Sequence, residues 1–160
     1  MSDVEIRPLV AADRAWVAQF IVEQWGDAMV VAHGRVYYPA ELPGFAAFAD
    51  GRCVGLLSYE LAGDACEIVT LDSLLEGRGI GSRLIAAVLA AARAAGCARL
   101  WLITTNDNMR ALHFYQKRGF ALVAVHRGAV DRARALKPAI PTLGFGGIPL
   151  HDEIELERWL

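Results

Sequence analysis

The sequence predicts a single α/β domain with a mixed, mostly antiparallel sheet of six or seven strands and helices on both faces. The chain has 160 residues and is 55% hydrophobic, which is enough for one core but too little for two. Asp50-Gly51 separates two apolar runs and is typical of a tight hairpin. Residues 65–104 read as strand, helix and strand without a tight turn, which indicates a parallel crossover.

The first part of the chain contains a short strand and a helix. Residues 4–7 alternate and stop at Pro8, and apolar residues then recur at helical spacing to about residue 24, after an Ala12-Asp13 cap. The periodicity is lost over 25–43, where we expect a loop with one short helix. Strands are predicted at 44–49, 53–60 and 65–74.

The second part begins with the clearest helix. Apolar residues recur every three to five positions from Ile80, and Gly96 stands where a C-terminal cap belongs. A buried strand at 99–104 precedes a helix that starts at Asp107 or Asn108 and closes at Gly119. Strands follow at 120–126 and 151–160. Residues 128–152, rich in Pro and Gly after a helical turn or two, should form an ordered arm that acts as a lid or a dimer contact.

Composition limits the classes of partner. The net charge is −2, the pI is near 6.1, and the sixteen Lys and Arg residues are scattered, so nucleic acid is not an expected partner. Neither a signal peptide nor an apolar run of membrane-spanning length is present, and we expect a cytoplasmic protein. Cys53, Cys66 and Cys97 form no C-x-x-C pair and are interpreted as buried, reduced thiols. The four histidines lack metal-ligand spacing, so no metal is expected.

A glycine-rich stretch at 71–82 ends an apolar strand and opens the long helix. Gly77, Gly79 and Gly81 allow unusual backbone dihedral angles and close approach of a ligand to the amides. The first amides of a helix lack intrahelical partners and lie at the positive end of its dipole, so the stretch is predicted to hold a phosphate or pyrophosphate. Ser82 departs from the dinucleotide fingerprint, and no Gly-Lys pair forms a P-loop. A strand-to-helix turn without a ligand stays an alternative.

Two motifs resemble the GNAT superfamily of N-acetyltransferases. The acetyl-CoA loop of that family reads Gln/Arg-x-x-Gly-x-Gly/Ala, and residues 76–81 match its glycines. A later family motif, Asn-x-x-Ala-x-x-aromatic-Tyr-x-x-x-Gly-Phe, is matched over residues 108–120. Glu76 departs from the usual Gln or Arg, and a carboxylate near a pyrophosphate is unfavourable if it points inward. Arg78 would then be the nearest cation for the phosphates.

The resemblance implies an acetyl-CoA-dependent enzyme of GNAT-like fold. Tyr115 would protonate the departing thiolate, because a phenol with a pKa near 10 is still protonated at neutral pH. A backbone amide near Leu71 would meet the oxyanion, and Glu67, with Glu60 and Asp72 as lesser candidates, would accept the proton of the amine. The implied acetyl-CoA contacts are Leu71, Arg78, Gly79, Ile80, Gly81, Ser82, Asn108 and Tyr115.

The acceptor is indicated only by composition. Trp25, Tyr37 and Tyr38, with Glu41 nearby, would suit a cationic amine, small or peptidic. We therefore expect acetyl transfer to a primary amine by direct attack in a ternary complex. One alternative is a catalytically inactive CoA-binding sensor or partner domain of the same fold. Another is a protein that binds nucleotides or other phosphate ligands, which would leave the motif at 108–120 unexplained. A homodimer is expected if the arm reaches a second subunit rather than closing over the acceptor pocket.

Overall fold

The computed structural model describes residues 3–160, and within them it contains four α-helices and a mixed seven-stranded sheet, so the predicted fold class is confirmed. The chain divides into two compact units: residues 3–30, 38–100 and 160 form the first, and residues 31–37 and 101–159 form the second. The first unit contains β1 (Glu5–Pro8), α1 (Arg14–Trp25), β4 (Gly44–Ala49), β5 (Arg52–Ala62), β6 (Ala65–Ser73) and α2 (Ile80–Ala94). The second contains most of β2 (Val30–Ala32) and β7 (Arg99–Thr105), together with β3 (Arg35–Tyr37), α3 (Met109–Lys117), β8 (Ala121–His126), α4 (Ala129–Ala133) and β9 (Glu153–Trp159).

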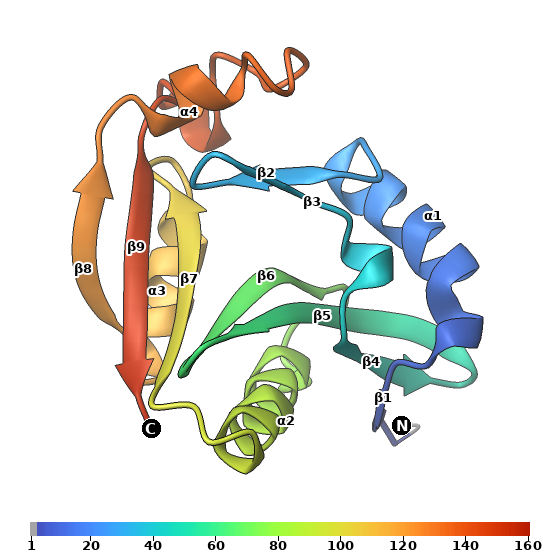
Figure 1. Cartoon of the computed structure of the whole chain (residues 1–160). Helices are drawn as coiled ribbons and strands as arrows, with labels where there is room; N and C mark the ends of the chain where they lie inside the picture. The colour runs from blue at the N-terminus through green and yellow to red at the C-terminus, as the bar shows by residue number, and fades with distance from the viewer. Residues whose placement is uncertain (1–2) are drawn as a thin grey trace. The chain divides into compact units, whose positions relative to one another are not determined.

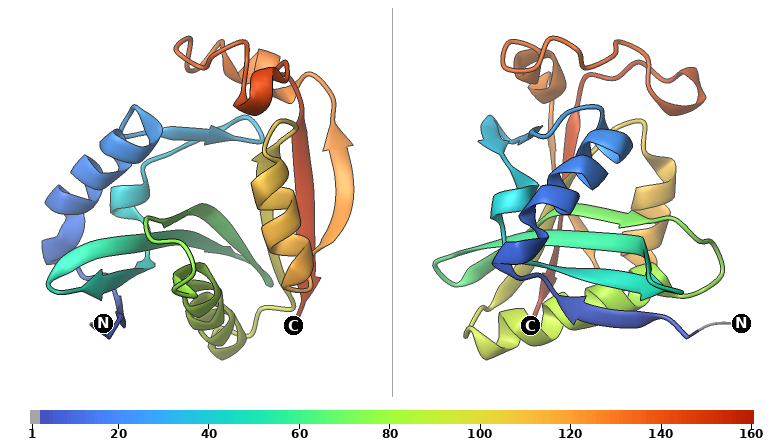
Figure 2. Two further views of the ribbon diagram at one scale, coloured as in Figure 1. Left: turned by 180° about the vertical axis from the view of Figure 1, so that it is seen from behind. Right: turned by 90° about the vertical axis from the view of Figure 1, so that its right-hand side faces the viewer.

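The strands of the first unit lie in the order β1-β4-β5-β6, and each pairs antiparallel with the next. Helices α1 and α2 lie on opposite sides of these strands (Figure 1 and Figure 2). Helix α2 packs closely against Gly55 on β5. A Cβ at this position would lie only 2.6 Å from Cγ2 of Ile80, so any larger residue would clash with the helix. The predicted hairpin at Asp50-Gly51 is present, with φ values of 51° and 74° at its two turn residues.

A β-bulge interrupts the pairing of β5 with β6. Ser58 lies opposite Thr70, but the next residue of β5, Tyr59, lies opposite Ile68, so Val69 is an extra residue in β6. Directly opposed residues of an antiparallel pair point to the same face. The bulge therefore changes which residues of β6 share a face before and after Val69.

In the second unit the strand order is β7-β9-β8. β8 and β9 pair antiparallel, and β9 also runs opposite to β7 (Figure 1), with the amide of Asn106 donating to the carbonyl of Asp152 at one end. Helix α3 covers one face of these strands (Figure 2). Tyr115 and Phe120 are buried and meet edge to face, with ring centroids 5.3 Å apart.

The loop with one short helix predicted for residues 25–43 is only partly right. The predicted short helix is present as a 3₁₀ turn at Pro39–Glu41, but β2 and β3 form a two-stranded hairpin that was not expected. Its turn is His33-Gly34, with φ values of 41° and 78°. His-Gly is not one of the dipeptides that mark tight hairpin turns, such as Asn-Gly or Asp-Gly, so no turn was predicted here.

Residues 128–152 form an arm beyond the ends of β8 and β9 (Figure 1). The arm contains α4 and a turn in which Leu143 bridges to Pro149. The guanidinium of Arg134 is only 19% exposed and binds three arm carbonyls: Nε donates to Ile140 over 3.2 Å, and Nη2 donates to Pro141 and Leu150, each over 2.6 Å. One side chain thus ties the two limbs of the arm together.

Candidate functional site

The glycine loop between β6 and α2 has the backbone that the sequence predicts. Gly77 and Gly79 lie in the left-handed region, with φ values of 70° and 67°, and Gly79 is the N-cap residue of α2. A Cβ added to either glycine would meet no atom within 4 Å. Glycine is therefore required here by the backbone angle, and the surface above the loop is open.

The start of α2 presents amide donors. The amide of Arg83 makes an intrahelical bond to the carbonyl of Gly79, and the residues before it belong to the turn whose amides have no helical acceptor. No side chain caps this terminus. The guanidinium of Arg83 donates to the carbonyl of Val4 over 2.5 Å, whereas Arg78 lies within the loop itself and is half-buried. The residues at 78–82 fit an anionic group such as a pyrophosphate.

Strand β6 carries the predicted oxyanion residue and the predicted base. Leu71 is half-buried opposite Leu57, and Glu67 is 4% exposed opposite Glu60. Uninterrupted alternation would place Glu67 on the same face as Leu71. The bulge at Val69 overturns that expectation, because it puts Glu67 on the face of Thr70 and Asp72 instead.

Asp72, near the end of β6, has a raised pKa. Burial raises its pKa to about 6, although a hydrogen bond from Trp25 acts in the opposite direction. The donor is the indole Nε1, 2.9 Å from Oδ2 of Asp72. The structure thus joins Trp25, predicted to contact the acceptor, to a residue that the sequence offered only as a lesser candidate for the base.

Tyr115 and Asn108 lie on α3, two turns apart. Tyr115 is 7% exposed, and its ring meets those of Phe114 and Phe120 edge to face. Oδ1 of Asn108 caps the helix by accepting the amide of Ala111 over 3.0 Å. Part of the motif at 108–120 therefore has a folding role, because Asn108 caps the helix and Tyr115 packs in an aromatic cluster.

The predicted acceptor residues differ in their surroundings. Tyr37 is 3% exposed, its hydroxyl lies 3.0 Å from Nε2 of His33, and the guanidinium of Arg35 lies over its ring. Tyr38 is 52% exposed, and Trp25 is 41% exposed beside Asp72. Because the Tyr37 hydroxyl is hydrogen-bonded to His33 within the second unit, it is already committed to a protein partner.

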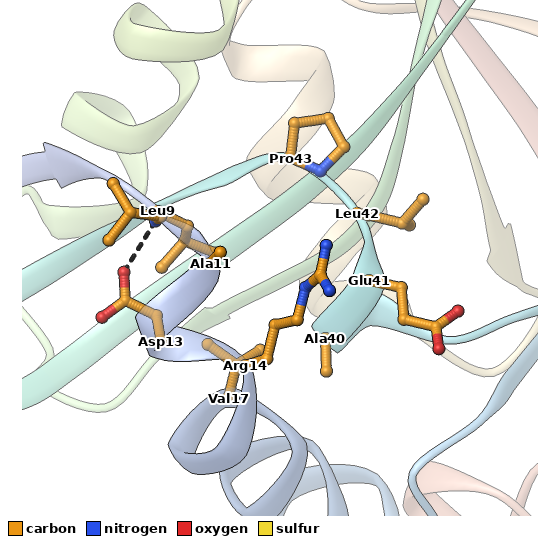
Figure 3. Close-up of a pocket in the computed structure, with 10 residues that line it drawn as sticks. Leu9, Ala11, Asp13, Arg14, Val17, Ala40, Glu41, Leu42 and Pro43 are labelled. Carbon is orange, nitrogen blue, oxygen red and sulfur yellow. Dashed lines mark hydrogen bonds between the residues drawn. The ribbon is translucent and has the colours of Figure 1, made fainter.

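A pocket of about 180 Å³ lies between the start of α1 and residues 40–43 (Figure 3). The Arg14 side chain reaches toward Pro43, and the carboxylate of Asp13 accepts the amide of Val10. Asp13 also accepts from Arg7 and Trp16, and these donors hold its pKa far below the usual range. Asp13 is therefore committed to folding contacts and is not available as a base.

A second pocket, of about 400 Å³, was not foreseen from the sequence. It lies in the second unit, where the β2–β3 turn, α4 and the end of β8 meet the start of β9, and its polar lining is His33, His126, Arg132 and Glu153. Glu153 is 4% exposed. No local pattern could have revealed it, because its residues come from four separate segments.

All three cysteines are free: Cys66 and Cys97 are buried, as predicted, whereas Cys53 is only half-buried. Burial raises the pKa of Cys66 to about 12. Within residues 3–160, no group of three or more His, Cys, Asp or Glu side chains is placed to hold a metal ion. None of the helices in this part of the chain has the length and apolar character needed to cross a membrane.

Comparison with curated proteins finds relatives along nearly the whole chain. An uncharacterized protein of Bacillus subtilis, YdhI, is 42% identical over 139 residues, covering 86% of this chain and 87% of its own. A second uncharacterized protein of that organism, YxbD, is 39% identical over 158 residues, covering 98% of this chain and 99% of its own. The second match includes the arm.

Solved structures share the fold. The IAA acetyltransferase from Bacillus cereus superposes with a TM-score of 0.73 at 20% identity, covering 99% of this chain and 100% of that protein. A GNAT family acetyltransferase from Elizabethkingia anophelis, solved with acetyl-CoA bound, gives a TM-score of 0.69 at 19% identity and covers both chains completely. The model of the acetyltransferase (GNAT) family matches residues 11–120, which include both the glycine loop and the Asn108–Phe120 motif. The chain therefore belongs to the GNAT family of acetyltransferases.

Proposed function

We propose that this protein transfers the acetyl group of acetyl-CoA to a primary amine by direct attack in a ternary complex. The observation that carries the proposal is the uncapped N-terminus of α2, introduced by left-handed Gly77 and Gly79 and open to solvent. Such a terminus suits the pyrophosphate of CoA, with Arg78 as its nearby cation. The acetyl-CoA bound to the Elizabethkingia anophelis enzyme supports the same choice of cosubstrate.

The reaction requires two proton transfers. An amine is mostly protonated at neutral pH and must lose a proton before its nitrogen attacks the thioester carbonyl. The tetrahedral intermediate then collapses as the C–S bond breaks, and the thiolate takes a proton. In our proposal the Tyr115 hydroxyl supplies that proton, and a β6 main-chain amide near Leu71 stabilises the oxyanion. The products are an acetylated amine and CoA.

In our proposal the base lies on the face of β6 that carries Glu67 and Asp72. Glu67, the residue predicted from the resemblance, and Asp72 share this face because of the bulge. A base works best when its pKa is near the working pH, and the pKa of Asp72 is raised to about 6. This match favours Asp72 as the group that accepts the proton, with Glu67 as the alternative.

An inactive CoA-binding sensor of the same fold is the second candidate function. It needs the glycine loop but no acid, so Tyr115 favours the enzyme. The decisive measurement is release of free thiol from acetyl-CoA in the presence of a panel of amines and peptides, with mass spectrometry of the product. Calorimetry with CoA alone gives the control. Tight CoA binding without acetylation of any acceptor would favour the sensor.

A further inference from the structure

The pocket formed by His33, His126, Arg132 and Glu153 contains a buried carboxylate with spare capacity to accept hydrogen bonds. The oxygens of Glu153 lie 3.1 and 3.3 Å from the amide nitrogen of His33. Within residues 3–160 this amide is the carboxylate's only hydrogen-bond donor. A carboxylate offers about four lone-pair positions, and burial without enough donors is costly. Burial indeed raises the pKa of Glu153. A ligand ammonium would supply the missing donors.

The same pocket has a cation, Arg132, on its wall. Nη1 of Arg132 donates to the carbonyl of Arg127 over 3.1 Å, which leaves Nε and Nη2 available to a ligand. The two imidazoles on the wall already have partners: Nε2 of His126 lies 3.0 Å from Glu155, and Nε2 of His33 lies 3.0 Å from Tyr37. Arg132 is therefore the group suited to bind a carboxylate, and a guanidinium can do so with two parallel bonds.

The remaining wall is apolar. It is formed by Ala129 and Ala133 of α4 and by Leu136 in the turn after this helix. The pocket thus combines one anion, one cation and a small aliphatic surface. This set of groups is complementary to the ammonium, the carboxylate and the first carbons of an α-amino acid.

The position of the pocket indicates which end of an acceptor it would hold. The start of β9 lies beside Asn106, whose Oδ1 accepts the amides of His151 and Asp152. Helix α3 begins just after Asn106, and Tyr115 follows Asn108 by seven residues, which is about 10 Å along a helix. A group bound to Glu153 is therefore well separated from the proposed acid, so the reacting amine belongs at the other end of the acceptor.

We propose that this pocket binds the α-amino-acid head group of a diamino acceptor, with its ammonium on Glu153 and its carboxylate on Arg132. The proposal rests on the proposed function, because it assigns the acceptor class of the same enzyme. The second, distal amine of such a molecule is the one acetylated. The class is a free diamino acid of the lysine type.

Three probes separate the two contacts: lysine, cadaverine (which lacks the carboxylate) and 6-aminohexanoate (which lacks the α-ammonium). Glu153→Gln keeps an oxygen for the His33 amide but removes the charge, so it should raise KM for lysine about 10- to 100-fold and leave KM for 6-aminohexanoate unchanged. Arg132→Met should raise KM for lysine and 6-aminohexanoate by a similar factor and leave cadaverine unaffected. Arg127→Met removes a neighbouring exposed charge outside the pocket lining and should change none of them.

Binding without turnover separates this proposal from the proposed function. Lysine added to the protein without acetyl-CoA should shift the NMR amide signal of His33, and Glu153→Gln should abolish the shift. If simple amines are acetylated but neither variant alters the preference for lysine, the pocket assignment is wrong and the enzyme stands. If lysine binds in this way and no acceptor is ever acetylated, the pocket stands and the transferase proposal is wrong. Product analysis must also show acetyl on the distal nitrogen; acetyl on the α-nitrogen would overturn the orientation.

Discussion

Nε1 of Trp25 donates to Oδ2 of Asp72 over 2.9 Å and thereby joins the last residue of α1 to a strand 47 residues further along the chain. This contact orients the carboxylate while burial keeps its pKa near 6. A carboxylate of that kind is protonated in mildly acidic solution and ionised at neutral pH.

If Asp72 is the base, kcat/KM should rise as the pH increases through about 6 and then level off, because only the ionised form accepts a proton. Asp72→Asn should remove this limb and lower the rate by roughly 10²- to 10⁴-fold. A pH series of initial rates with both proteins measures the effect. Glu67→Gln is the comparison: if it removes the limb and Asp72→Asn does not, the base is Glu67.

Asp72 should also affect stability in a pH-dependent manner. Its pKa is about 6 in the folded protein and 3.8 in the unfolded chain, so the folded state binds the proton more tightly and loses stability as the pH rises from about 4 to 6. Asp72→Asn carries no charge to bury and can still accept from Trp25. It should therefore be more stable than the native protein at pH 8, by roughly 1–2 kcal/mol, and nearly equal to it at pH 4. Thermal unfolding at the two pH values tests this sign.

Gly79→Val should weaken acetyl-CoA binding at least tenfold, since its side chain would stand over the amides that hold the pyrophosphate. Gly96→Val is a matched control, because Gly96 follows the other end of α2 with φ 79° and equally open space. Both variants pay the same kind of backbone cost, so their melting temperatures should fall together. Calorimetry with acetyl-CoA should show a loss of affinity only for Gly79→Val; equal affinities would refute the role of the loop.

Tyr115→Phe should lower kcat by roughly 10²- to 10⁴-fold while leaving acetyl-CoA affinity nearly unchanged, because it removes a proton donor and almost no volume. The packing of the ring against Phe114 and Phe120 should survive. Tyr59→Phe, on β5, is the control and should retain full activity. Wild-type turnover by Tyr115→Phe would mean that another group or water protonates the thiolate.

Arg134→Met should loosen the arm, because three carbonyls lose a charged donor at once. We expect faster proteolysis within 134–150 and a stability loss of roughly 1–3 kcal/mol. Asp131→Asn breaks only the exposed ion pair with Arg134 and should have little effect, since Asp131 is 59% exposed. Equal cleavage of both variants would show that the arm does not depend on the Arg134 contacts.

Much of the fold could be predicted because its signals are local. Asp50-Gly51, Gly79, Gly96 and the Asn108 cap each act within a few residues, and each lies where the sequence predicts. The His33-Gly34 turn was missed because His-Gly is not one of the dipeptides that mark tight hairpin turns. Periodicity and the capping and turn residues together placed most other strands and helices, with ends that differ by a few residues from those observed.

The parts of the site that escaped prediction depend on distant pairings. The bulge at Val69 cannot be read from one strand, because it is defined by the register with β5. The contact of Trp25 with Asp72 and the burial of Glu153 arise only when separate segments pack. Sequence patterns therefore predicted the glycine loop well but not the acid–base surroundings on β6 or the polar pocket beside α4.

The extra residue at Val69 also constrains how this protein can change over time. Deleting Val69 would remove the bulge and leave every other residue of β6 opposite its present partner on β5, so Glu67 and Asp72 would still share a face. Losing the bulge while keeping all the residues would instead slip one half of β6 by one position and turn it over relative to the other. We therefore expect relatives either to keep both the bulge and the number of residues between Glu67 and Asp72, or to lose the bulge together with one residue. Here the register of the strand, rather than the identity of the side chain at position 69, is what function preserves.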